Sequence, residues 1–95
     1  MENNFELKQL SNDTYELVLF NSWNNETMPK NIKDLEKQNF SNKSKIQIDF
    51  KNLKECNSSA IIYLISFTKQ FPQENIKLIN LDLYENKYKF YEKHY

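Results

Sequence analysis

Two adjacent serines, Ser58 and Ser59, are the side chains of this sequence whose type and position best suit a functional role. They follow the apolar stretch 46–50 after a short polar segment, and they precede the apolar run 60–65. This order predicts a buried strand, a short loop and a helix beginning at the serines, where free backbone N–H groups and the positive end of the helix dipole lie. A hydroxyl at that point caps the helix, carries a phosphate or marks a docking edge.

The other reactive side chains do not form a catalytic or metal-binding set. The single histidine, His94, lies beside the terminus, so a Ser-His-Asp or Cys-His arrangement would need its base on a frayed end. Cys56, the single cysteine, precedes the predicted helix, where a small buried residue is commoner than a reactive thiolate. Two pairs of carboxylates lie in lysine-rich stretches typical of solvated helix faces: Asp34 with Glu36, and Asp82 with Glu85. We expect no enzymatic activity, no metal ion and no cofactor.

Charge and composition argue against several classes of partner. The 13 basic and 13 acidic residues give a net charge of +0, and every basic residue is lysine, so the sequence does not favour nucleic acid. One cysteine excludes an internal disulfide and suits a cytosolic protein. No apolar run approaches the roughly 20 residues that cross a bilayer, and the N-terminus lacks the features of a signal peptide. We therefore expect a cytoplasmic location.

The hydrophobic pattern predicts one small α/β domain over residues 1–95. Alternating apolar residues predict a hairpin of strands at 5–9 and 15–19 around a turn at 11–13. The stretch 21–26 is polar except for Trp23 and precedes a predicted helix at 27–38. A central strand at 45–50, a helix from Ser58 that ends before Pro72, a strand at 75–80 and a helix at 82–95 follow. The expected fold is a mixed sheet of about four strands, an N-terminal hairpin followed by βαβα units, with helices packed on it.

The residues around Ser58 resemble the signature of STAS domains, the sulfate transporter and anti-sigma factor antagonist family. In that family an apolar strand ending in Asp is followed by a loop and a D-S-S-G or D-T-S-G motif that caps an apolar helix. The corresponding residues here are Asp49, then Asn57, Ser58, Ser59 and Ala60, so two of the four motif positions match. The resemblance extends to the order and length of the elements over residues 5–95.

The resemblance implies a protein-interaction domain, closest to the STAS proteins of bacterial lipid-asymmetry ABC transporters. These proteins bind the cytoplasmic side of the permease, and in some bacteria a similar domain is fused to the permease N-terminus. The first hydroxyl of the motif, which matters for that assembly, corresponds to Ser58. We expect the chain to support the permease or ATPase subunits of a phospholipid transporter, in cis or in trans, at the cytoplasmic face of the inner membrane.

An anti-sigma factor antagonist is the alternative that the resemblance implies. In those proteins the second hydroxyl of the motif, here Ser59, is phosphorylated by an anti-sigma factor kinase. A phosphate would add about two negative charges and so repel or remodel the docked partner. Asn57 and Ala60 replace the Asp and Gly of the motif, and these departures weaken the match to the kinase-controlled branch.

The partner-binding surface is expected on the side of the predicted helix that the core does not use. It comprises Asn57, Ser58, Ser59, Ile62, Tyr63 and Phe67, whereas Ile61, Leu64 and Ile65 have the spacing of core residues. Tyr63 and Phe67 lie four residues apart and form either an anchor pair for a partner or a pair packed under the neighbouring helix.

Tyrosines at helical spacing mark the last segment: Tyr84, Tyr88, Tyr91 and Tyr95. Part of the stripe packs on the sheet with its phenolic oxygens reaching solvent, or the stripe contacts another protein or a further part of the same polypeptide. The sequence closes on Lys93, His94 and Tyr95 without a helix-ending glycine or proline, which suggests that the native chain continues.

Overall fold

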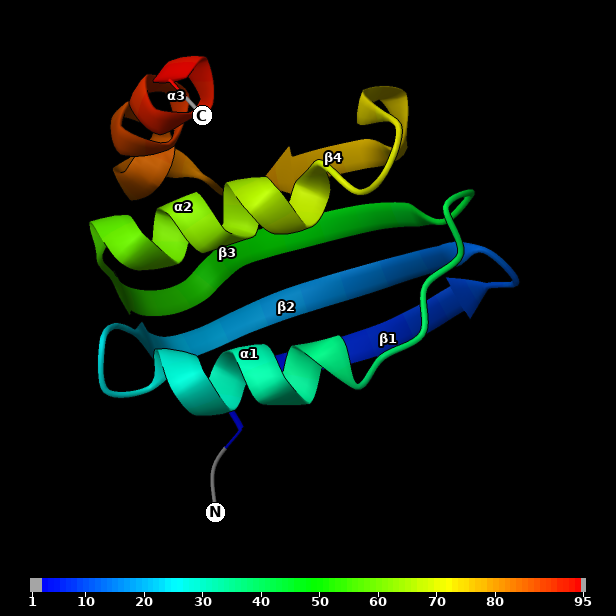
Figure 1. Ribbon diagram of the computed structural model, residues 1–95, viewed down its shortest axis with the longest axis horizontal. Helices are drawn as coiled ribbons and strands as arrows, with labels where there is room; N and C mark the ends of the chain where they lie inside the picture. The colour runs from blue at the N-terminus through cyan, green and yellow to red at the C-terminus, as the bar shows by residue number, and fades with distance from the viewer. Residues whose placement is uncertain (1–2, 95) are drawn as a thin grey trace.

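The computed structural model describes residues 3–94, and within this range the chain forms a four-stranded sheet with helices α1 and α2 in front of it (Figure 1). The elements in chain order are β1 (Phe5–Ser11), β2 (Thr14–Trp23), α1 (Met28–Glu36), β3 (Lys45–Cys56), α2 (Ser58–Thr68), β4 (Ile76–Ile79) and α3 (Glu85–His94). The strands lie in the order β1-β2-β3-β4, with β1 antiparallel to β2 and the other pairs parallel. The predicted fold class, a hairpin followed by βαβα units around a mixed sheet, is confirmed.

Both crossover helices cover the same face of the sheet. Each crossover connects neighbouring parallel strands and steps in the same direction across the sheet, so right-handed connections place α1 and α2 on one side. Strand residues on this side, such as Leu17 and Ile48, are buried with the apolar residues of α2. The opposite side carries polar residues in register, where the Gln47 amide donates to the Glu16 carboxylate over 2.8 Å.

Strands β2 and β3 extend beyond the predicted boundaries. Residues 51–56, predicted as a loop, continue β3, and β2 continues through Trp23. Val18 pairs with Asp49 but Phe20 pairs with Asn52, so β3 contains an extra residue, and a second shift follows. At such bulges, buried residues are three positions apart and not two. The alternation of buried and exposed residues that marks a regular strand is therefore absent from residues 51–56.

The end of β2 holds the start of α2 in place. Trp23, which is fully buried, donates its indole N–H to the Asn4 carbonyl over 2.9 Å. The Trp23 carbonyl accepts the backbone N–H of Asn57 over 3.1 Å. The same residue therefore fixes the N-terminal segment and the strand-to-helix junction that carries the serines.

Helix α3 and the turn before it cover the part of β3 that β4 leaves unpaired. The short β4 pairs only with residues 46–49 of β3. Beyond that point the Tyr84 hydroxyl donates to the Leu53 carbonyl over 3.0 Å, and Tyr88, 2% exposed, packs edge-on against Phe50. Tyr84 and Tyr88 thus pack against the sheet, as one of the two interpretations of the tyrosine stripe predicted. Tyr88 differs from that interpretation in one respect, because it is too buried for its hydroxyl to reach solvent. Tyr95 lies outside the described residues.

Two asparagines adopt the left-handed backbone conformation in a sequence that contains no glycine. Asn21 has a φ of 53° and lies at the second register shift of β2, and Asn80 has a φ of 56° directly after β4. Asparagine tolerates this region better than other residues with a Cβ atom. Among residues 3–94, asparagine thus occupies the two positive-φ positions, where glycine is usual.

The described helices are short. Helix α2, the most apolar of them, has 11 residues, whereas a bilayer requires roughly 20. Across residues 3–94, no helix has both the length and the apolar character needed to cross a membrane.

Candidate functional site

The cap at the start of α2 is formed by Asn57 and not by a serine. The Asn57 side-chain oxygen accepts the Ala60 N–H over 2.9 Å, and its carbonyl accepts the Ile61 N–H over 3.1 Å. Its amide nitrogen donates to the side chain of Asn25, in the turn before α1, over 3.0 Å. Asparagine is among the residue types that cap the N-terminus of a helix well.

Ser58 and Ser59 are the first two residues of α2. Ser58 is half-buried and Ser59 is exposed. Within residues 3–94, neither hydroxyl has a hydrogen-bond partner, and the backbone N–H groups of both residues also lack a protein acceptor. The two hydroxyls are thus available for another interaction, because the capping function belongs to their neighbour.

The remaining predicted site residues differ in exposure. Ile62 and Tyr63 are half-buried, but Phe67 is only 6% exposed. The expectation that Phe67 forms part of the accessible surface of α2 is wrong, because its ring packs against Phe40 and Phe71 at centroid distances of 5.8 and 5.6 Å. Tyr63 and Phe67 were expected to form either an anchor pair for a partner or a packed pair. Phe67 is packed in the core, whereas Tyr63 remains partly accessible.

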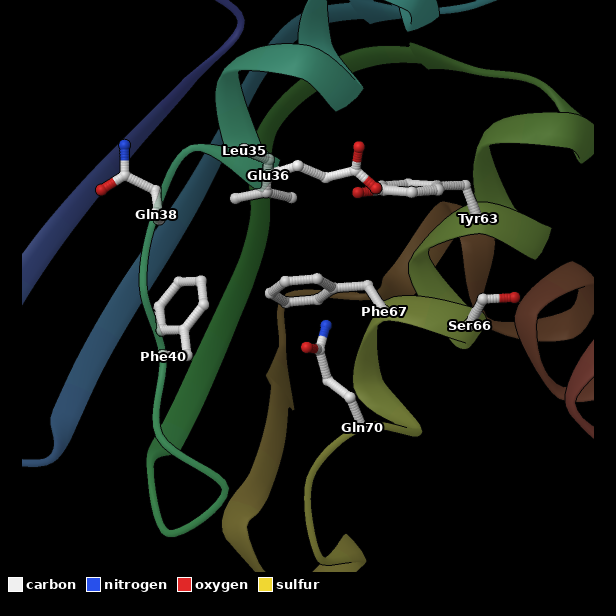
Figure 2. Close-up of a pocket in the computed structure, with 8 residues that line it drawn as sticks. All are labelled: Leu35, Glu36, Gln38, Phe40, Tyr63, Ser66, Phe67 and Gln70. Atoms are coloured by element: carbon white, nitrogen blue, oxygen red, sulfur yellow. The ribbon is translucent and has the colours of Figure 1, made fainter.

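A groove separates the C-terminal end of α1 from α2 and includes Tyr63 and Phe67 (Figure 2). We call it the α1/α2 groove. Its volume is about 430 Å³, and its lining residues are Leu35, Glu36, Gln38, Phe40, Tyr63, Ser66, Phe67 and Gln70. The helix α2 residues Ser59, Tyr63 and Ser66 are spaced at i, i+4 and i+7, so they follow one side of the helix, and Gln70 lies in the turn just after its end. The predicted partner surface and the groove are therefore contiguous along α2.

Tyr63 is the titratable group most affected by the groove. Its partial burial raises the pKa of the phenol to about 12, and the negative charge of Glu36 on α1 adds to the effect. Figure 2 shows the Glu36 side chain extending toward the phenol of Tyr63. The phenol therefore remains protonated at neutral pH and presents a hydroxyl to the groove.

Phe40 belongs to the candidate site but was not predicted from the sequence. It lies in the connection between α1 and β3, where its ring meets those of Phe67 and Phe71, at 5.8 and 5.7 Å, and that of Tyr15, at 5.2 Å, all nearly perpendicular. An isolated aromatic residue in the polar stretch 37–45 has no periodicity to mark it. Its only signal is the presence of a large apolar side chain in a connection.

Cys56 and His94 lie at the ends of different elements, Cys56 at the end of β3 and His94 at the end of α3. Cys56 is buried at the end of β3, and this burial raises the pKa of its thiol to about 12. The imidazole of His94 lies 4.8 Å from the ring of Phe90 at the far end of α3. No cluster of three metal-ligating His, Cys, Asp or Glu side chains occurs in the part of the chain that the structure describes.

In each of the two carboxylate pairs, one carboxylate is ion-paired with lysine. Asp34 contacts Lys30 at 2.6 Å and Lys37 at 3.8 Å, and the bond from Lys30 is the main reason that the pKa of this carboxyl is lowered. Glu85 contacts Lys89 at 3.1 Å. Both pairs lie on solvated helix faces.

Comparison of the chain with protein-family models, with curated proteins and with solved structures found no match.

Proposed function

We propose that this chain is a protein-interaction domain of the STAS type that supports an ABC-type phospholipid transporter. Its docking surface would be the N-terminal half of α2, with Ser58, Ser59, Ile62 and Tyr63 in contact with the permease or ATPase subunits. Docking there would hold the domain at the cytoplasmic face of the inner membrane. The domain itself would carry out no chemistry.

The observation that carries the proposal is the division of roles at the start of α2. Asn57 satisfies the first turn of the helix, so the hydroxyls of Ser58 and Ser59 are not needed for capping. Two polar groups without partners, next to the half-buried apolar side chain of Ile62, make a surface that another protein could complete. The order of strands and helices, which agrees with the family expectation, gives further support.

Copurification of the full chain with the permease and ATPase subunits of the lipid-asymmetry transporter from the same organism tests the proposal. The wild-type chain should remain bound, and Ser58→Arg should weaken binding by about tenfold or more, because a long charged side chain at the centre of a contact prevents close packing. Asn86→Arg, at an exposed position of α3, is the matched control and should bind as the wild type does. Equal binding of Ser58→Arg and wild type, or the absence of any complex, would contradict the proposal.

A phosphorylation-controlled partner switch is the second candidate function, and the exposure of Ser59 favours it. A phosphate on the second residue of α2 would lie near the positive end of the helix and the free N–H groups of its first turn. Incubation with ATP and an anti-sigma factor kinase should then add the mass of one phosphate to the peptide containing Ser59. Ser59→Ala should abolish the addition, whereas Ser66→Ala, seven residues further along α2, should not.

The phosphomimetic variant Ser59→Asp separates the two candidates. In a partner switch this variant loses its partner without any kinase, because the added negative charge acts at the contact. A wild-type chain that gains no phosphate from the kinase, or a Ser59→Asp variant that keeps its partner, argues against the switch.

A further inference from the structure

The α1/α2 groove contains a carboxylate without a cationic partner. Glu36 is exposed on the last turn of α1 and forms no ion pair within residues 3–94. The neighbouring lysines Lys30 and Lys37 instead contact Asp34. Glu36 is also the only charged residue among those that line the groove. The groove therefore carries a net negative charge although the chain as a whole is neutral.

Aromatic rings supply the second feature of this groove. Figure 2 shows the rings of Tyr63 and Phe67 one above the other along α2, with Phe40 across from Phe67. The rings of Phe40 and Phe67 are nearly perpendicular, with an interplanar angle of 76°. The face of an aromatic ring attracts a cation, and Tyr and Phe faces beside a carboxylate attract it more strongly than either feature alone.

The size of the groove suits one long side chain. A volume of about 430 Å³ lies within the range of roughly 300–1,000 Å³ that small binding sites occupy. The half-buried rings of Phe40 and Tyr63 offer apolar surface for an alkyl stem, and the exposed carboxylate of Glu36 is available to a charged head. Lysine and arginine are the protein side chains that combine these two parts.

We propose that the α1/α2 groove receives a lysine or arginine side chain of the partner protein that docks on α2. The inference rests on the proposed function, because it assumes that α2 is the docking surface, and it names the chemistry of one contact within it. The groove lies on the same side of α2 as Ser59, so a partner segment over the serines would continue directly into it. The cation would pair with Glu36 and stack on Tyr63.

An NMR titration of the full chain with Nα-acetyl-arginine amide tests the contact without any transporter subunit. The neutral comparator is Nα-acetyl-citrulline amide, which has almost the same shape and no charge. We expect chemical-shift changes centred on Phe40 and Tyr63, and a roughly fivefold preference for the arginine compound. Equal binding of the two compounds, or shifts located outside the groove, would overturn the proposal.

Two variants and a control assign the contact to named groups. Glu36→Gln should reduce the affinity for the arginine compound by roughly threefold, because it removes the charge and keeps the shape. Tyr63→Leu keeps an apolar side chain and removes the aromatic face, so it should cause a similar loss. Glu26→Gln, an exposed carboxylate in the turn before α1, should have no effect. Unchanged affinity in both groove variants would contradict the assignment.

Acetylcholine provides a further comparison, because a small quaternary ammonium ion also suits aromatic rings beside a carboxylate. Tighter binding of acetylcholine than of the arginine compound would overturn the assignment to a protein side chain. Since the titration contains no transporter subunit, its failure would leave the copurification result standing. A failed copurification with a successful titration would instead reject only the transporter as the partner.

Discussion

Asn57 contributes more to the start of α2 than the serines that follow it. The side-chain oxygen of Asn57 accepts the Ala60 N–H, and removal of such a cap costs about 1 kcal/mol. We expect Asn57→Ala to lower the free energy of unfolding by that amount, and Asn57→Asp to retain most of it. Urea denaturation followed by circular dichroism measures both variants.

Asn25→Ala is the matched control for the cap. This variant loses the hydrogen bond from the Asn57 amide but leaves the cap to the Ala60 N–H intact. Its effect should therefore be smaller than that of Asn57→Ala. A larger loss from Ser58→Ala than from Asn57→Ala would show that the hydroxyl is the true cap.

Cys56 makes stability depend on pH in the alkaline range. Burial raises the pKa of its thiol from 9.0 to about 12, so above pH 9 the unfolded chain releases this proton while the folded chain keeps it. The unfolded state then binds fewer protons, and the free energy of unfolding falls as pH rises. The loss from this one group should reach about 1 kcal/mol by pH 10.

The variant Cys56→Ala isolates this contribution. Its free energy of unfolding should fall less steeply between pH 9 and pH 10 than that of the wild type, as measured by urea denaturation at each pH. This window lies below the ordinary tyrosine value of 10.0, so most of the difference between the two slopes comes from the thiol. Identical slopes would mean that the thiol ionises in the folded chain as readily as in the unfolded one.

The residues of the candidate site were predictable from the sequence only in part. The paired serines stand out because an apolar run follows them, and the structure indeed starts α2 there. Capping by a serine hydroxyl is one of the three roles that the sequence leaves open, and the structure gives the cap to Asn57, a residue type that caps as well as serine does. Phe67 was placed at the surface because helical spacing does not show that Phe40, from a distant connection, covers one side of α2.

At the scale of elements, the edge of β3 is completed by a side chain and not by a strand. The Tyr84 hydroxyl donates to the Leu53 carbonyl beyond the end of β4. We expect Tyr84→Phe to lower the free energy of unfolding by about 1 kcal/mol, since it leaves this carbonyl without its partner. Hydrogen exchange should also become faster in α3, which follows this contact directly.

Tyr15→Phe is the control for the loss of a phenolic hydroxyl. The ring of Tyr15 packs edge-on against Phe40, but its hydroxyl has no hydrogen-bond partner in residues 3–94. This variant should therefore change stability by only a few tenths of a kcal/mol. If both variants lose the same free energy, the contact with Leu53 does not support the edge.

The order of elements was predictable, whereas the length of two strands was not. Helix α1 begins within one residue of its predicted start, which the proline at position 29 marks, and β4 begins within one residue of its own, which the apolar residues after Pro72 mark. In β3 the buried residues Phe50, Leu53 and Cys56 are three residues apart. This spacing matches neither the period of two residues in a regular strand nor the period of 3.6 residues in an α-helix. The register shifts that cause this spacing depend on pairing with β2, a long-range property that a local pattern does not contain.

For the whole molecule, Trp23 is a natural reporter of folding. It is the single tryptophan of the sequence, and it contacts the N-terminal segment, the sheet and the start of α2. A domain with one core should unfold in a single transition, so tryptophan fluorescence and far-ultraviolet circular dichroism should give the same urea midpoint. A fluorescence midpoint well below that of circular dichroism would reveal a hairpin that detaches before the rest.

The two left-handed asparagines constrain how this sequence can vary. A chain without glycine has a less flexible unfolded state, so the common stabilising exchange of glycine for alanine has no target here. Asn21 and Asn80 are instead the positions where introducing a glycine would release backbone strain. A β-branched residue at either position would disfavour the left-handed backbone conformation, so natural variants there should be confined to asparagine, aspartate and glycine.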